Sequence, residues 1–177
     1  MDKLGALEVP LGVVGSIGID PVGTSRVGID DTAGARTAVN HLINLGHERI
    51  AMIGGGVSDA EPNPFTTPED RRVGYRRSLA DAGLTWHPEY EVDGRYTATG
   101  GEQAMGSLLG LEHPPTGVFA QSDRMAVGAM HALRRAGLSC PEDVSIIGFD
   151  DHEVAAPLDL STIAQPMAEQ GVLGADL

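Results

Sequence analysis

The segment PTGVFAQSDRMAVGAMHALRRAGLSCPEDVSIIGFDD, residues 115–151, decides the fold that we predict for this chain. It is typical of a buried strand, an amphipathic helix and a second buried strand that ends in carboxylates. The short apolar run at residues 118–120 suits a strand that is covered on both faces. Ser122 or Asp123 can cap the helix, because a short side-chain oxygen accepts from backbone N–H groups that lack a partner. Gly137 suits the left-handed residue that ends a helix.

The second strand of this segment, residues 144–148, leads into Phe149, Asp150 and Asp151. In open α/β sheets, ligands bind beyond the carboxyl ends of the strands. The segment is therefore a βαβ unit that places carboxylates at the rim where a ligand is expected.

From Asp31 onward, helix and strand signals alternate to the end of the chain. Asp31 is expected to cap one helix, Thr67-Pro68 to begin another, and Thr97 or Thr99 to open a third. This alternation predicts an α/β fold with a parallel sheet and helices on both faces. Strands predicted at residues 11–17 and 26–29 have no evident partner, and open edges of that kind invite pairing with another molecule.

The composition limits the function of the chain in several ways. It has 177 residues, and 12 basic against 25 acidic side chains give it a net charge of −13. Such a charge repels phosphate backbones, so we do not expect this segment itself to bind DNA or anionic lipid. With a single cysteine, Cys140, and no apolar run of the ~20 residues that a membrane span requires, we expect a cytoplasmic protein that does not enter a membrane.

Several segments, in their order and spacing, resemble the LacI/GalR-type bacterial transcriptional regulators. The resemblance covers most of residues 27–166. The matching segments are VGIDD at residues 27–31, HLINLGHERIA at 41–51, RRVGY at 71–75, SDRMAVGA at 122–129 and PEDVSIIGFDD at 141–151.

This resemblance implies an effector-binding core of two α/β subdomains, similar to type I periplasmic binding proteins, with a small polar effector, most simply a sugar, between them. Residues 32–164 would form the C-terminal subdomain. Residues 1–31 and 165–177 would be remnants of the N-terminal subdomain, with hinge crossovers. The family's DNA-binding headpiece has no counterpart here, so operator DNA would be bound only through a missing headpiece. The resemblance also implies a homodimer.

Four residues are predicted to contact the effector. Arg71 matches the arginine that the family places in the cleft, where a guanidinium can donate to two sugar hydroxyls or to a carboxylate. The alternatives are an exposed arginine at a helix start, or that Arg72 points inward. Asp150 matches the family's effector-contacting aspartate and can accept two hydroxyl hydrogen bonds, while Asp151 is assigned to capping the next turn.

The other two are Tyr96 and Ser122. Tyr96 matches a position where family members often carry an aromatic ring against the ligand, although a half-buried loop tyrosine is an equal alternative. Ser122 stands where sugar-responsive members often have asparagine, and its shorter side chain offers one hydroxyl in place of an amide. The run of acids and histidine at residues 150–153 lacks the spacing of a cation loop, so we expect neither a metal nor a cofactor.

Two other functional classes are compatible with such a fold. A periplasmic-type sugar-binding protein of a transport system is the main alternative. An α/β enzyme with Asp150 or Asp123 as general base is disfavoured, because the sequence pairs neither carboxylate with a second catalytic group. We therefore expect no enzymatic activity.

Overall fold

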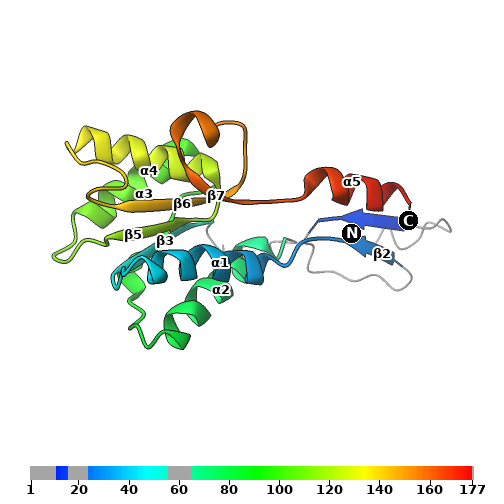
Figure 1. Cartoon of the computed structure of the whole chain (residues 1–177), viewed down its shortest axis with the longest axis horizontal. Coiled ribbons are helices and arrows are strands. Elements are labelled where there is room, and N and C mark those ends of the chain that lie inside the picture. The colour runs from blue at the N-terminus through cyan, green and yellow to red at the C-terminus, as the bar shows by residue number, and fades with distance from the viewer. Residues whose placement is uncertain (1–10, 16–23, 56–64, 177) are drawn as a thin grey trace.

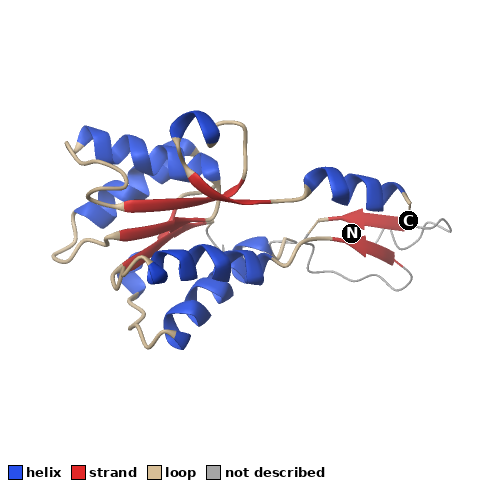
Figure 2. Cartoon of the chain, in the orientation of Figure 1, coloured by secondary structure: helices blue, strands red, loops and turns tan. Residues whose placement is uncertain are grey.

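The computed structural model describes residues 11–15, 24–55 and 65–176. It has a larger part built around a five-stranded sheet and a smaller part formed by two strands and the last helix (Figure 1; Figure 2). In chain order the elements, with η for a 3-10 helix, are β1 (Leu11–Val14), β2 (Thr24–Val27), α1 (Asp31–Asn44), β3 (Ile50–Gly54), α2 (Thr67–Asp81), η1 (Pro88–Tyr90), β4 (Glu91–Asp93), α3 (Ala98–Leu109), β5 (Gly117–Ala120), α4 (Asp123–Arg135), β6 (Ser145–Asp150), η2 (Ala156–Leu158), β7 (Ser161–Ala164) and α5 (Met167–Ala175).

The larger sheet has the strand order β4-β3-β5-β6-β7, and every neighbouring pair is parallel. Helices α1 and α2 cover one face, and α3 and α4 cover the other (Figure 1). Parallel strands that are buried on both faces read as continuous apolar runs, which is why the strand at residues 117–120 was detectable from sequence. The predicted α/β fold with helices on both faces is confirmed.

Two apolar cores lie on opposite faces of this sheet, and aliphatic side chains dominate both. The core under α3 and α4 includes Met105, Leu108, Val118, Met125, Leu133 and Ile146. The core under α1 and α2 includes Val39, Leu42, Ile50, Tyr75, Leu79, Phe119 and Phe149.

Glycines let the paired helices on each face approach closely. A Cβ at Gly74 of α2 would lie 2.5 Å from the Thr32 carbonyl oxygen of α1. A Cβ at Gly128 of α4 would meet the carbonyl group of Ala98 at the start of α3. At these distances a methyl group fits only if the helix backbones separate.

The smaller part corrects one prediction. Strands β1 and β2, expected to lack partners within the chain, pair with each other in parallel, with Val13 opposite Arg26. Helix α5 packs against both strands (Figure 1). Residues 16 and 17, the last two of the strand predicted at residues 11–17, lie outside the described residues.

The cap of α1 also differs from prediction. Asp30, not Asp31, caps α1, because its Oδ1 accepts from Ala33 N at 2.8 Å. Helix α2 begins at Thr67 as predicted, but the Thr67 hydroxyl does not cap it and instead donates to Asp31 Oδ2 at 3.3 Å. Of the predicted alternatives, Thr97 caps α3 and Ser122 caps α4. Among the described helices, none has the length and apolar character needed to cross a bilayer.

Candidate functional site

The carboxyl ends of the larger sheet's strands and the first turns of α1, α2 and α4 meet at one edge, which faces the smaller part (Figure 1). This arrangement follows from parallel βαβ connections, since each strand ends where the next helix begins. Polar residues at these ends are thereby brought together from distant places in the sequence.

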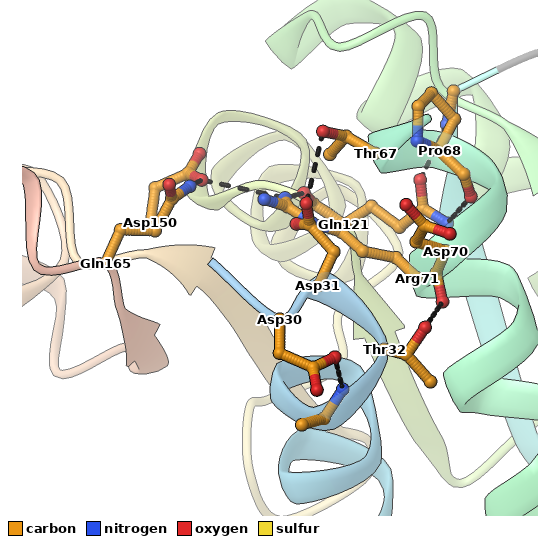
Figure 3. A network of polar contacts seen from close by, with 12 residues as sticks. Asp30, Asp31, Thr32, Thr67, Pro68, Asp70, Arg71, Gln121, Asp150 and Gln165 are labelled. Atoms are coloured by element: carbon orange, nitrogen blue, oxygen red, sulfur yellow. Dashed lines mark hydrogen bonds and ion pairs between the residues drawn. The ribbon is translucent and has the colours of Figure 1, made fainter. Parts of the chain in front are cut away.

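Arg71, in the first turns of α2, is buried at this edge with 3% of its surface exposed. Its Nε donates to Asp31 Oδ1 at 2.7 Å, and a terminal nitrogen donates to the Gln121 carbonyl oxygen at 2.5 Å (Figure 3). Its guanidinium carbon lies 3.6 Å from the centroid of the Phe149 ring, a cation–π contact. Arg72 instead pairs with acidic side chains, so Arg71 is the arginine that points inward.

Asp150 ends β6 and lies beside Arg71, with 3.6 Å between its Oδ1 and a terminal nitrogen of the guanidinium. Gln165 Nε2 donates to the same oxygen at 2.5 Å (Figure 3). Burial raises the pKa of Asp150 above its ordinary value, and the nearby Arg71 charge only partly offsets this. The Asp150 side chain remains 36% exposed, so its carboxylate is accessible to a ligand.

The backbone at the end of β6 is strained. Asp150 has a φ of 120° and Asp151 a φ of 54°, both in the region that non-glycine residues rarely adopt. Such conformations persist where surrounding contacts hold them, and they concentrate at binding sites.

Two hollows open at this edge and share Tyr96 and Asp150. The first, about 340 Å³, lies between the larger part and the smaller part; the second, about 430 Å³, lies over the start of α4. The first is lined by Val14, Gly15, Ile29, Asp31, Thr67, Arg71, Tyr96, Asp150, Gln165, Met167 and Gln170. The second is lined by Tyr96, Ala98, Ser122, Arg124, Val127, Asp150, His152 and Val154.

Each of the four residues predicted from sequence lines one of these hollows or both. Arg71 faces the hollow between the two parts, Ser122 faces the other, and Tyr96 and Asp150 border both. Residues 71, 96, 122 and 150 therefore converge on two neighbouring hollows at the sheet edge.

Tyr96 is held in place by its hydroxyl group, which donates to Gln121 Oε1 at 2.9 Å. Its φ is 52°, and its ring packs against Gly55, where a Cβ would meet the ring atoms. Burial raises the pKa of Tyr96 to about 12, so the hydroxyl stays protonated and remains a hydrogen-bond donor at neutral pH.

Ser122 has a structural task at the same time. Its hydroxyl oxygen accepts from Met125 N at 3.3 Å and so caps α4. A hydroxyl group that accepts one hydrogen bond still has its own proton to donate. Ser122 can therefore cap the helix and donate toward the 430 Å³ hollow.

Sequence reasoning missed two residues of this site, Asp31 and Gln121. Asp31 was expected to cap α1, but it is buried against Arg71. Gln121 is fully buried; its amide nitrogen donates to the Pro68 carbonyl at 3.0 Å, and its amide oxygen accepts from Gly55 N at 3.2 Å and from the Tyr96 hydroxyl. The sequence signal for Gln121 was its position as a long polar residue directly after an apolar strand, at the edge of the sheet where the site was expected.

The turn after β6 corrects the role given to Asp151. The backbone N–H of His152 donates to Asp123 Oδ2 at 2.7 Å, and the backbone N–H of Val154 donates to His152 Nδ1 at 3.4 Å. The Asp151 side chain takes no part in these hydrogen bonds. Asp123 Oδ1 also accepts from the Thr162 hydroxyl at 2.5 Å. Asp123 is thus a fully buried structural carboxylate, and the described residues contain no group of three metal-ligating side chains.

The family model of the periplasmic binding protein-like domain matches residues 39–177. The chain belongs to this family. Among curated relatives, the "HTH-type transcriptional repressor CytR" of Escherichia coli (strain K12) is 42% identical over 147 residues, which is 82% of this chain and 41% of the relative. The "Probable HTH-type transcriptional repressor ExuR" of Bacillus subtilis (strain 168) is 38% identical over 170 residues, 95% of this chain and 49% of the relative.

Solved structures show the same relationship. A LacI transcriptional regulator from Rhodococcus species has a TM-score of 0.85 and 36% identity, covering 99% of this chain and 63% of its own. The CelR–cellobiose complex has a TM-score of 0.81 and 29% identity, covering 96% of this chain and 58% of its own. The predicted resemblance to LacI/GalR-type regulators is therefore confirmed. The chain spans about half the length of the curated relatives it matches, and these are named as repressors rather than enzymes.

Proposed function

We propose that this chain is the effector-sensing core of a LacI-type transcriptional regulator, and that its effector is a small, uncharged, hydroxyl-rich molecule such as a sugar. The observation that carries this proposal is the convergence of Arg71 and Asp150 on a hollow of about 340 Å³ between the two parts of the fold. The names of its relatives support a role in transcription, and the CelR–cellobiose complex is similar in fold.

The charges around this hollow favour a neutral effector over an acidic one. Its described lining contains one arginine, Arg71, and two aspartates, Asp31 and Asp150. Arg71 is paired with buried Asp31, so its positive charge is already compensated. Within the described lining of this hollow, an incoming carboxylate or phosphate would meet Asp150 and no uncompensated cation, whereas hydroxyl groups can donate to that carboxylate. The exposed Arg124 lines the neighbouring hollow instead.

The geometry also supports a mechanism of population shift. The chain passes from the smaller to the larger part at residues 28–30 and returns at residues 165–166. We assign residues 32–164 to the C-terminal subdomain, and residues 1–31 and 165–177 to the N-terminal subdomain. An effector that contacts both sides stabilises one relative arrangement of the subdomains, and that arrangement sets how a regulator presents its DNA-binding segments.

The partners follow from the same proposal. Operator DNA is bound through a segment outside these residues, because the net charge of −13 opposes contact between this core and phosphates. The regulator is a cytoplasmic homodimer, and sedimentation of the full-length protein as a monomer at high concentration would contradict this. A transport binding protein would share the fold, but the relatives named above are repressors.

Calorimetric titration with matched pairs of compounds tests the proposal. Each pair differs in one acidic group: D-glucose and D-glucuronate, D-galactose and D-galacturonate, D-ribose and ribose 5-phosphate; cellobiose is added as a neutral disaccharide. We expect at least one neutral compound to bind, and its acidic partner to bind at least tenfold more weakly. Binding of only the acidic compounds, or of none of the panel, would refute the proposal.

A further inference from the structure

Gln170, a long polar residue of α5, is buried beside the hollow between the two parts. Gln170 has 6% of its surface exposed and lines the hollow of about 340 Å³. Its neighbour along the same wall, Met167, is 62% exposed. The side-chain amide nitrogen of Gln170 is buried without a hydrogen-bond partner, one of two such side-chain atoms in the described part of the chain.

An unpaired amide at this position is unfavourable in the empty protein. Burial removes the hydrogen bonds that the amide makes to water, and nothing in the described structure replaces them. Leucine or methionine would fill a similar volume in the same helix without this cost. This cost suggests that a bound molecule supplies the hydrogen-bond partner of the Gln170 amide.

We infer that Gln170 is a specificity-determining residue that donates a hydrogen bond from its amide nitrogen to an oxygen of the effector. This inference rests on the proposed function and adds a contact from the α5 side of the hollow. Gln170 belongs to the smaller part, while Arg71 and Asp150 belong to the larger part, and all three line the same space. The effector must then offer an acceptor oxygen toward α5 and a hydroxyl donor toward Asp150.

Such a contact discriminates between similar compounds. A site built to hydrogen-bond one group of a ligand rejects analogues that lack it, because the buried polar group is left unpaired. Since Gln170 and Asp150 lie on different parts of the fold, a molecule that satisfies both also connects the two parts. Gln170 thereby links recognition to the arrangement of the subdomains.

The test uses Gln170→Leu, because the inference predicts opposite changes in stability and in binding. Without effector, this variant should unfold at a higher urea concentration than the wild type, since a buried unpaired donor is removed. Its affinity for the neutral compound of the panel that binds the wild type most tightly should fall by tenfold or more. Gln103→Leu, which removes an exposed glutamine side chain from α3, is the control and should change neither quantity appreciably.

The outcomes separate this inference from the proposed function. If the wild type binds a neutral sugar and Gln170→Leu binds it equally well, Gln170 is only structural and the inference is wrong. If Gln170→Leu does not fold, Gln170→Met provides the same comparison with a more flexible side chain. Loss of stability in both variants would show that the amide already has a stabilising partner, which also overturns the inference. Failure of the wild type to bind any compound refutes the proposed function itself.

Discussion

Asp31 Oδ1 lies 2.7 Å from Arg71 Nε, and the two side chains are almost completely buried, with 2% and 4% of their surfaces exposed. The pair joins the first turn of α1 to the first turns of α2 at the edge where the candidate site lies (Figure 3). A buried ion pair adds little net stability over apolar packing, but removing one partner leaves an uncompensated charge. Asp31 therefore acts on the site through Arg71.

Two adjacent aspartates allow this relationship to be tested. Asp31→Ala should lower the free energy of unfolding by roughly 3–5 kcal/mol, because Arg71 is left buried without its carboxylate. Asp30→Ala removes the α1 cap instead and should cost about 1 kcal/mol. Urea denaturation of the two variants measures both values. A similar loss for the two would mean that both aspartates act only as helix-start residues.

Asp150 gives a prediction for the dependence of stability on pH. Because burial raises its pKa, the folded protein holds this proton at a higher pH than the unfolded chain does. The stability associated with protonated Asp150 is thus fully present below its ordinary pKa and is lost as the pH rises through the raised value. Relative to Asp150→Asn, the wild type should gain stability as the pH falls through this range. Urea denaturation of both proteins across acidic pH checks this, and a relative loss for the wild type would show the opposite sign of shift.

Two variants of Tyr96 separate the contribution of its ring to effector binding from the contribution of its hydroxyl group to stability. Tyr96→Phe removes the hydrogen bond to Gln121 and should cost about 1 kcal/mol of stability while keeping the ring against the effector. Tyr96→Ala removes the ring as well and should weaken binding of a neutral sugar by about tenfold. Calorimetric titration of both variants distinguishes the two effects. Equal affinities for wild type and Tyr96→Ala would remove Tyr96 from the effector site.

The contact between α3 and α4 depends on the absence of a side chain at one position. Gly128→Ala should destabilise the protein by about 1–3 kcal/mol, because the new methyl group overlaps the Ala98 carbonyl and forces the helices apart. Gly106→Ala should instead stabilise the protein by up to about 1 kcal/mol. Gly106 is on the exposed side of α3, and a Cβ there would have no neighbouring atom within 4 Å. Thermal denaturation of the pair shows both signs, and a stabilising Gly128→Ala would contradict the close packing described here.

Most of the larger part was predictable because its strands are apolar runs between strong helix signals. Strands form at residues 117–120 and 145–150, where the sequence predicted strands at 118–120 and 144–148. Thr97 and Ser122 cap the expected helices. The pairing of β1 with β2 was not predictable, since a short strand does not encode its partner. Strand pairing depends on the arrangement of the whole chain.

The candidate site was predictable in part, through residues whose position at strand and helix ends is set by the βαβ order. Arg71, Tyr96, Ser122 and Asp150 each line one or both of the two neighbouring hollows. Asp31 was missed because a shift of one residue at a helix start exchanges a capping carboxylate for a buried one, as the neighbouring side chains point about 100° apart. Which of the two aspartates faces inward is settled by packing against α2.

In the proposed function, Asp150 accepts hydrogen bonds from an uncharged effector. The most direct test of this is calorimetric titration at pH 7 of wild type and Asp150→Asn with the neutral sugar that binds the wild type most tightly. Asparagine keeps the size of the side chain and an acceptor oxygen for Gln165, but loses the charge. We expect an affinity roughly ten- to hundredfold lower for Asp150→Asn with no loss of folding stability. Equal affinity in the two proteins would contradict it.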